Sequence, residues 1–440
     1  MYFSTQKWAF YFGKSADFLF RISVWSVEFC VVANRSRAFF VCVTSVAHTF
    51  LFFGGKEMRK LLSLLAAIVL VFALSACGKS KTTSNTETIT DLGVCSAENT
   101  SLNINARNPW DIAVIDNFVY TAVGDFDSNS GPTSIWRTNI DDLKWESSGQ
   151  FEQEAFIRFL NLNDKIIAIG ADPMSNSQYA EAYVLRNNKW ENFVQIKDAL
   201  HIFDAEYFND EYFFGVGYGD NNYPIVKFSP ETKEYINVPL YKNGTDVIAA
   251  LSQNGDIKYK RVYDLFSVDQ KLFCAFSCSY NGGKTTIEFF EYKDNKFEFC
   301  QALKMSGIQM EKPIKNQILL NADAVINNTC YLSFGNLYTT TDFVKFDKVS
   351  VPEDACVTDM FVDKNNDLEI LYILASKKVD SVYKNTIYRV ENNDLIEVVT
   401  FNKECSALSF AKQGNDFYIG LGGDGLMLQD TGRIIKITVK

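Results

Sequence analysis

The chain has 440 residues, with 43 Lys or Arg and 53 Asp or Glu, and its formal net charge is −10 at pH 7. Residues 1–57 contain six basic and three acidic residues, and residues 58–77 add only Arg59 and Lys60, so the rest of the chain has 35 bases against 50 acids. A surface with this excess of acid repels nucleic acid and favours metal cations and basic ligands. The charge balance therefore argues against nucleic-acid binding.

Residues 1–57 have an unusual composition, since they hold 11 of the 37 Phe. Gly54-Gly55-Lys56-Glu57 directly precede Met58, and their codons can contain a ribosome-binding sequence. We therefore predict that translation starts at Met58 and that residues 1–57 are an untranslated extension. The alternative is a membrane segment near residues 38–53, which contains His48 and is short for a span.

Residues 58–77 have the order of a secretory signal: two cations, an apolar run over residues 61–72, and small residues before Cys77. The alternative is an uncleaved membrane helix, for which the apolar run is short. Leu74-Ser75-Ala76-Cys77 resembles the lipobox of bacterial lipoproteins. The resemblance implies that Cys77 is lipid-modified and becomes the first mature residue. The protein is then expected on the extracytoplasmic face of a bacterial membrane.

Residues 78–95 are predicted to be a flexible tether. Residues 80–90 are polar and lack the apolar periodicity that would bury a face.

Residues 96–440 are dominated by short β-branched and aromatic runs, which predict an all-β domain. A pair of hairpins recurs seven times, and the second hairpin closes on an aromatic residue or Ile. Intervals of 45, 45, 62, 49, 50 and 38 residues separate these closing residues, which are Trp145, Trp190, Tyr235, Phe297, Phe346, Ile396 and Ile434. This period predicts a β-propeller of seven four-stranded blades, because neighbouring sheets cover one another's faces. Six or eight blades, or an array of β-sandwiches, are the alternatives.

Two segments resemble degenerate sialidase-type (BNR) repeats: Tyr-Thr-Thr-Thr-Asp-Phe-Val-Lys-Phe at residues 338–346 and Ile-Trp-Arg-Thr-Asn at residues 135–139. Residues 183–190 and Gly422-Gly423 are similar to fragments of kelch repeats. Both resemblances imply a propeller. Because the sequence has no intact Ser-x-Asp-x-Gly-x-Thr-Trp motif, they imply no activity.

A charged position recurs at the start of the first strand of each unit. It holds Asp111, Arg158, Asp204, Asp264, Asp323 and Asp359, with Ala407 in the seventh unit. If these strands line the central channel, one rim carries a ring of five aspartates and one arginine, which would raise one another's pKa or attract a cation. The alternative is that each Asp caps a local turn.

A candidate calcium site is formed by Asp125, Asp127 and Asn129, which resemble the Asp-x-Asp-x-Asn opening of a calcium-binding loop. Gly131 comes one place late, and Trp136 stands where an EF-hand has its bidentate Glu. The alternative is a solvated hairpin loop.

We assign no catalytic residues. His201 is the only histidine after residue 77, so a histidine-rich metal site is excluded and a catalytic triad would have to include this residue. Arg107, Arg158 and Arg261 lie near the starts of inner strands, as in a sialidase, but no Arg-Ile-Pro motif accompanies them.

The sequence is interpreted as a surface lipoprotein whose propeller is a rigid binding module for a saccharide, peptide or protein. The alternatives are an extracellular carbohydrate-active hydrolase or lyase, and a scaffold for envelope assembly. Calcium is the one cofactor that the sequence motifs indicate.

Overall fold

The computed structural model describes residues 9–12, 18–24, 27–33, 39–43, 87–95, 107–124, 131–142, 144–174, 179–217, 223–253, 257–280, 286–304, 323–333, 337–365, 368–423 and 428–440. The chain divides into two units, Met1–Ser84 and Asn85–Lys440. The first unit contains an antiparallel sheet of β1 (Ala9–Phe12), β2 (Phe18–Val24), β3 (Val27–Ala33) and β4 (Phe39–Val43). Translation from Met58 stays a prediction, and the proposed signal at residues 58–77 lies outside the described residues. None of the helices in the described ranges combines the length and apolarity that a bilayer crossing requires.

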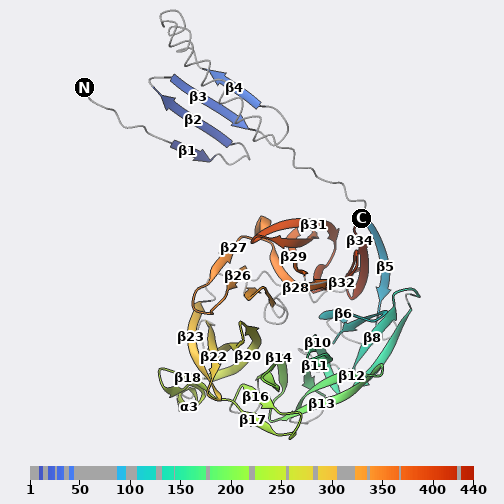
Figure 1. The fold of residues 1–440 in the computed structure, drawn as a ribbon. Helices are drawn as coiled ribbons and strands as arrows, with labels where there is room; N and C mark the ends of the chain where they lie inside the picture. The colour runs from blue at the N-terminus through green and yellow to red at the C-terminus, as the bar shows by residue number, and fades with distance from the viewer. Residues whose placement is uncertain are drawn as a thin grey trace, which may run out of the picture. The chain divides into compact units, whose positions relative to one another are not determined.

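The second unit is a β-propeller of seven four-stranded antiparallel blades around a central axis (Figure 1), so the predicted fold is confirmed. Blade 1 comprises β6 (Asp111–Ile115), β7 (Phe118–Ala122), β8 (Thr133–Asn139) and β9 (Trp145–Phe151). Blade 2 comprises β10 (Gln153–Leu162), β11 (Lys165–Pro173), β12 (Tyr179–Arg186) and β13 (Lys189–Lys197). Blade 3 comprises β14 (His201–Phe208), β15 (Glu211–Gly217), β16 (Ile225–Phe228) and β17 (Tyr235–Asn237).

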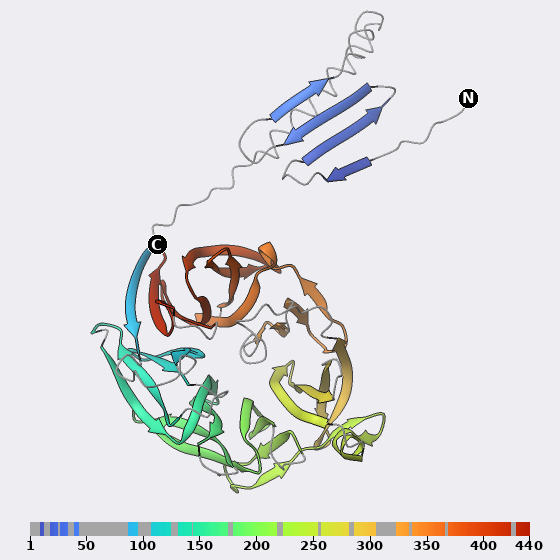
Figure 2. The ribbon, with the colours of Figure 1, turned by 180° about the vertical axis from the view of Figure 1, so that it is seen from behind.

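The ring continues in the same order, and the view from behind shows the same succession (Figure 2). Blade 4 comprises β20 (Ile257–Val268), β21 (Lys271–Tyr280), β22 (Thr286–Lys293) and β23 (Lys296–Lys304). Blade 5 comprises β24 (Asp323–Ile326), β25 (Thr329–Ser333), β26 (Leu337–Thr340) and β27 (Asp347–Val349), and a short 3₁₀ helix (Pro352–Asp354) follows it. Blade 6 comprises β28 (Cys356–Asn365), β29 (Leu368–Val379), β30 (Val382–Glu391) and β31 (Asp394–Lys403). Blade 7 comprises β32 (Ser406–Gln413), β33 (Asp416–Gly422), β34 (Arg433–Thr438) and β5 (Thr88–Val94).

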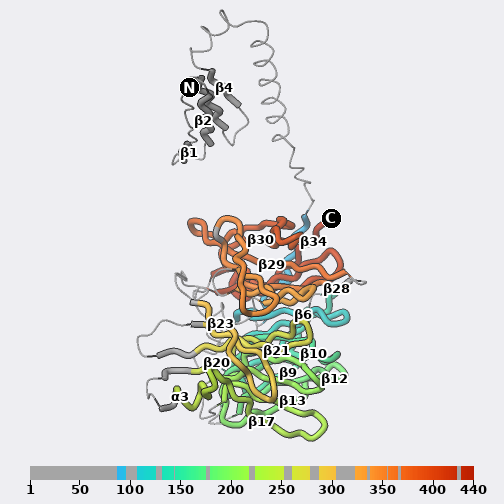
Figure 3. The backbone as a smooth tube through the Cα atoms, turned by 60° about the vertical axis from the view of Figure 1, so that its left-hand side comes forward, coloured from blue at the N-terminus to red at the C-terminus, as the bar shows by residue number. Residues whose placement is uncertain are grey.

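Strand β5 closes the ring, so residues 88–94 of the predicted tether (residues 78–95) belong to the propeller, and residues 78–86 lie outside the described residues. It pairs antiparallel with β34, from Thr88 opposite Thr438 to Val94 opposite Arg433, and the two strands lie side by side in Figures 1 and 3. The last repeat is shorter than the others because its fourth strand comes from the other end of the domain. The edge of β34 supplies the backbone hydrogen bonds that this polar segment cannot make alone.

An insertion between blades 3 and 4 explains the 62-residue interval between Tyr235 and Phe297. It contains β18 (Leu240–Lys242), β19 (Thr245–Asp246) and α3 (Val247–Gln253). Strand β18 pairs in parallel with the outer strand β23, and Val247, Ile248 and Leu251 of α3 join the apolar core between blades 3 and 4. The insertion therefore covers the outer edge of blade 4.

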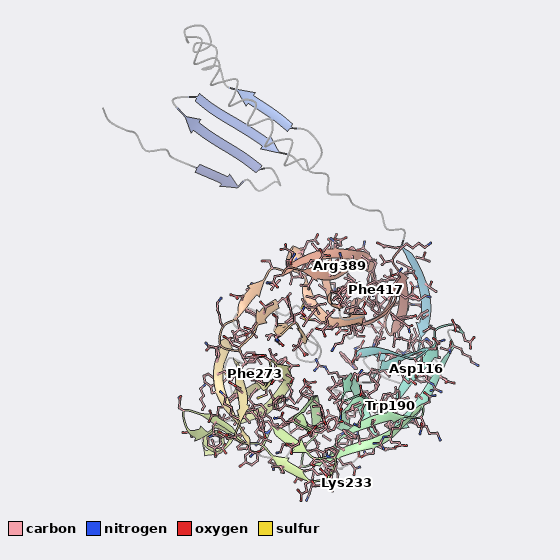
Figure 4. The ribbon with its side chains drawn as sticks, in the orientation of Figure 1. Asp116, Trp190, Lys233, Phe273, Arg389 and Phe417 are labelled. Carbon is pink, nitrogen blue, oxygen red and sulfur yellow. The ribbon has the colours of Figure 1, made fainter. Side chains whose placement is uncertain are left out.

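Aromatic side chains fill the spaces between blades. Trp190 of blade 2 meets Tyr120 of blade 1 edge-on, with ring centroids 5.9 Å apart. Between blades 4 and 5, Phe343 stacks on Phe273 at 4.3 Å. Figure 4 labels Trp190 and Phe273. These contacts show why large aromatic residues recur at the blade period.

The two ends of the ring differ. One end, here called the turn face, carries two-residue turns with both residues at positive φ, as type I′ hairpins require. Apart from Gln270 these residues are Asn or Asp, and the turns are residues 163–164, 187–188, 209–210, 269–270, 294–295, 327–328 and 392–393. The opposite end is here called the connection face. Strands that end and begin at this face are separated by longer stretches of sequence, among them those from Ala122 to Thr133, from Gly217 to Ile225, from Lys304 to Asp323 and from Gly422 to Arg433.

Candidate functional site

The predicted rim residues occupy one structural position on the inner strands. In β10, β14, β20 and β28 a β-bulge directly precedes Arg158, Asp204, Asp264 and Asp359. Asp111 and Asp323 are the first residues of β6 and β24. A bulge bends the strand and turns the following side chain. The same bulge therefore sets the direction of the charged side chain in blades 2, 3, 4 and 6.

In blade 7 this position belongs to Ser409, so the assignment of Ala407 is wrong. The bulge of β32 lies between Ala407 and Ser409. Sequence spacing alone does not reveal the extra residue. The Ser409 hydroxyl donates a hydrogen bond to the carbonyl oxygen of Pro109, 2.7 Å away, and so connects blade 7 to the residues that precede blade 1.

Arg158 of blade 2 lies at the centre of an ion cluster. Its Nη1 is 2.6 Å from Oδ1 of Asp204 in blade 3 and 3.6 Å from Oδ1 of Asp264 in blade 4. Its Nη2 donates to Oδ1 of Asp323 in blade 5. The planar guanidinium can serve several carboxylates at once, which a Lys ammonium does less well. One side chain therefore connects four consecutive blades.

Three aspartates form hydrogen bonds to the next blade. Oδ2 of Asp111 accepts from the backbone N–H of Phe159 at 2.6 Å, and Oδ2 of Asp204 accepts from that of Leu265 at 2.7 Å. In blade 6, Oδ2 of Asp359 accepts from the N–H of Phe410 at 2.8 Å. Each donor lies one residue past the equivalent position in the following blade.

Local capping, the alternative reading, occurs at the same residues. Oδ1 of Asp111 accepts from its neighbour Ile112 at 2.7 Å, and Oδ1 of Asp359 accepts from Met360 at 2.8 Å. One oxygen thus holds the local backbone while the other reaches the next blade.

Burial raises the pKa of the cluster's carboxyls. Desolvation is the largest cause, and it raises the pKa of Asp111 to about 7 and that of Asp204 to about 6, although Arg158 acts in the opposite direction. Desolvation also raises the pKa values of Asp264 and Asp359 well above their usual range. Desolvation lowers the pKa of Arg158, but the carboxylates of Asp323, Asp204 and Asp264 raise it well above the usual value overall. Burial therefore favours the protonated form of these carboxyls, while their negative charge favours the cationic form of Arg158.

Glu206 is a member of this region that the sequence reading missed. Desolvation, with the nearby Asp204, raises its pKa to about 8, and its Oε1 accepts a hydrogen bond from the backbone N–H of Tyr207 at 2.9 Å. It stands two residues after Asp204 on β14, so both side chains point to the same side of the strand. The Asp-x-Glu alternation was the signal that could have revealed it.

His201 and Arg261 contact the ring of Phe203, and neither is among the described contacts of Arg158. Nδ1 of His201 lies 3.0 Å from Oδ1 of Asp172, and its ring stacks on Phe203 at 5.2 Å. The Arg261 guanidinium lies over the same Phe203 ring, 5.3 Å from its centroid. A Cβ at Gly217 would approach Phe203 to 2.7 Å, so the glycine leaves room for this ring. Single backbone pairs, Ala171 with His201 and Gly217 with Arg261, join blades 2, 3 and 4 here.

A sialidase would gather Arg107, Arg158 and Arg261 at one site, but among the described residues each of them has different neighbours. Arg158 contacts carboxylates, and Arg261 lies on Phe203. Arg107 lies beside Gly432, since a Cβ added at Gly432 would be 2.8 Å from the Cβ of Arg107. Cys356 and Cys405, near the starts of the inner strands of blades 6 and 7, also have separate described contacts. The Cys356 thiol donates to the Val357 carbonyl, and that of Cys405 lies 3.5 Å from the Thr431 hydroxyl.

Two predicted sites lie outside the described residues: the lipid attachment at Cys77, and the calcium candidates Asp125, Asp127 and Asn129. Within the described ranges, no group of three or more His, Cys, Asp or Glu side chains is arranged to hold a metal ion.

No protein-family model matches the chain, and no curated protein matches it in sequence. Two solved structures are similar to it at 9% identity. BBS1N, in its complex with ARL6DN, gives a TM-score of 0.43 over 77% of this chain and 94% of that chain. Sqt1 of Saccharomyces cerevisiae gives 0.39 over 77% and 97%. The assignment of seven blades comes from the strand pairing of this chain itself.

Proposed function

We propose that this protein is an extracytoplasmic lipoprotein, anchored through Cys77, whose propeller is a rigid module that binds a peptide or protein partner at the connection face. The observation that carries the proposal is the asymmetry between the two faces, because binding sites are built from longer loops held on a rigid scaffold. The hydrogen bonds and ion pairs between blades along the axis supply that rigidity.

The entry of the chain into the propeller supports an orientation. Thr88 begins β5 opposite Thr438, which in turn pairs with Asp416 at the turn between β32 and β33. The chain therefore enters at the turn face. Residues 78–87 can span at most about 35 Å when extended. With Cys77 in the bilayer, the turn face lies toward the membrane and the connection face points away from it.

Charge indicates the class of partner. The chain after residue 77 has 35 bases against 50 acids, so a partner with a basic surface would be attracted over a long range. Binding of a saccharide in place of a protein is an outcome of the test below. The axial carboxyls already hold Arg158 and backbone amides, so the described geometry favours a binding role over hydrolysis.

Strand β29 offers a matched pair of probes for the binding face. Leu368 and Val379 are its two ends, at the turn face and the connection face, and their side chains are 61% and 42% exposed. A photo-crosslinking side chain at residue 379, used on intact cells, is expected to capture a protein partner, whereas the same probe at residue 368 is not. Capture from residue 368 alone would contradict the assigned face. Absence of protein capture with binding to soluble glycans would make the ligand a saccharide.

Anchoring is tested by lipid labelling of Cys77→Ala, with Cys300→Ala as the control that retains the lipobox. Loss of label only in Cys77→Ala supports the anchor, and retained label overturns it.

A further inference from the structure

The charged side chains that the inner strands bring together around Arg158, here called the axial cluster, contain more acidic than basic groups. Its single described cation, Arg158, comes from β10. The carboxyls come from the inner strands of five other blades: Asp111 of β6, Asp204 and Glu206 of β14, Asp264 of β20, Asp323 of β24 and Asp359 of β28. The remaining inner strand, β32, contributes the uncharged Ser409.

The side chains that meet at Arg158 are shielded from water. Those of Arg158, Asp204, Asp264 and Asp323 are only 7%, 4%, 7% and 18% exposed. Carboxylates that share one guanidinium in a poorly hydrated site repel one another strongly, and one guanidinium cannot neutralise all of them. The carboxyls must therefore keep protons or separate.

Within the cluster, the negative charge of Asp264 is the least well compensated by ion pairs and hydrogen bonds. It is 3.6 Å from Arg158, against 2.6 Å for Asp204. Asp111, Asp204 and Asp359 each accept a backbone N–H from the next blade, and the described contacts of Asp264 include only the longer ion pair. Burial raises its pKa well above the usual range, and Asp323 and Asp204 act in the same direction.

We propose that the axial cluster is a proton-dependent restraint on the propeller, in which a protonated Asp264 allows blades 2 to 5 to meet around Arg158. When Asp264 loses its proton, its charge repels Asp204 of blade 3 and Asp323 of blade 5. The inner ends of these blades then loosen. The connection face of the same blades includes the stack of His201, Phe203 and Arg261, so loosening there alters the end of the ring at which binding is proposed. The restraint itself does not depend on the proposed function.

The test compares thermal unfolding of the full chain, wild type and Asp264→Asn, from pH 5 to pH 9. Asn has the shape of the protonated acid and cannot ionise. The melting temperature of the wild type is expected to fall by a few degrees as the pH rises past neutrality, and that of Asp264→Asn is expected to fall less. Asp394→Asn, in an exposed position at the start of β31, is the matched control and should follow the wild type.

Parallel curves for wild type and Asp264→Asn would overturn the proposal, as would a wild-type melting temperature that does not fall. If Asp264→Asn does not fold, the infrared carbonyl band of protonated carboxyls decides the question in the wild type. A band that is present at pH 6 and disappears by pH 9 in the folded protein supports the proposal, and its absence at pH 6 overturns it.

Discussion

The indole Nε1 of Trp145 donates a hydrogen bond to the carbonyl oxygen of Leu92, 2.7 Å away. Trp145 begins the outer strand of blade 1, and Leu92 lies in β5, the outer strand of blade 7. The two ends of the ring are therefore joined by a side chain of blade 1 as well as by the pairing of β5 with β34.

We expect a chain that starts at residue 96 to be less stable than one that starts at residue 85, by roughly 2–4 kcal/mol. The shorter chain loses the buried Leu92 and the backbone hydrogen bonds of β5. Urea unfolding of the two fragments measures the difference. Deletion of residues 78–86 from the full chain is the control, because it shortens the tether and leaves β5 in place. Equal stability of the two fragments would show that β5 does not close the ring.

Asp359→Ala is expected to destabilise the protein by about 2–4 kcal/mol, because the backbone N–H groups of Met360 and Phe410 both lose their acceptor in a buried site. Asp359→Asn keeps one carbonyl oxygen and should cost less. Chemical denaturation of both variants gives the ranking. A loss that is the same for Ala and Asn would mean that the acceptor role is not what matters at this position.

Phe343→Ala is expected to cost about 3–5 kcal/mol, because Phe343 is fully buried against Phe266, Phe273 and Phe289. The adjacent Val344 is 54% exposed and provides the control. Val344→Ala should change stability by less than about 0.5 kcal/mol. Similar losses in both variants would contradict the described packing between blades 4 and 5.

Arg158→Met is expected to destabilise the protein by about 3–5 kcal/mol at pH 8, because it leaves buried carboxylates without their cation. The loss should be smaller at pH 5. Burial raises the pKa of Asp204 to about 6 and that of Asp111 to about 7, above the unfolded value near 4, so the folded state binds more protons than the unfolded state between these values. Stability from these groups therefore decreases as the pH rises through this window. An equal loss of stability at pH 5 and pH 8 would argue against proton uptake by the carboxyls around Arg158 in this range.

The calcium site at Asp125 and Asp127 stays a prediction. If these carboxylates bind calcium, the ion should raise the melting temperature of the wild type by mass action and leave the double Ala variant unchanged. The same calcium-dependent shift in both proteins would remove the site from consideration.

The number of blades could be read from the sequence because it depends on local repetition. Each blade repeats the same apolar alternation, and a closing residue such as Trp190 packs against the neighbouring blade. The positions of Asp111, Asp204 and Asp359 also follow the repeat, because each accepts a hydrogen bond from the next blade in the same way.

Other features depend on partners that are distant in the sequence. Strand β5 has little apolar pattern of its own, and its pairing with β34 joins residues more than 300 positions apart. The bulge that places Ser409 at the axis is a backbone distortion without a distinct local sequence. Arg158 stands in the repeat where aspartate is usual, but only the closed ring brings Asp323 from three blades away to its guanidinium. Local periodicity therefore determined the fold and the charged positions, whereas the closure of the ring decided which charges meet and how far from water they lie.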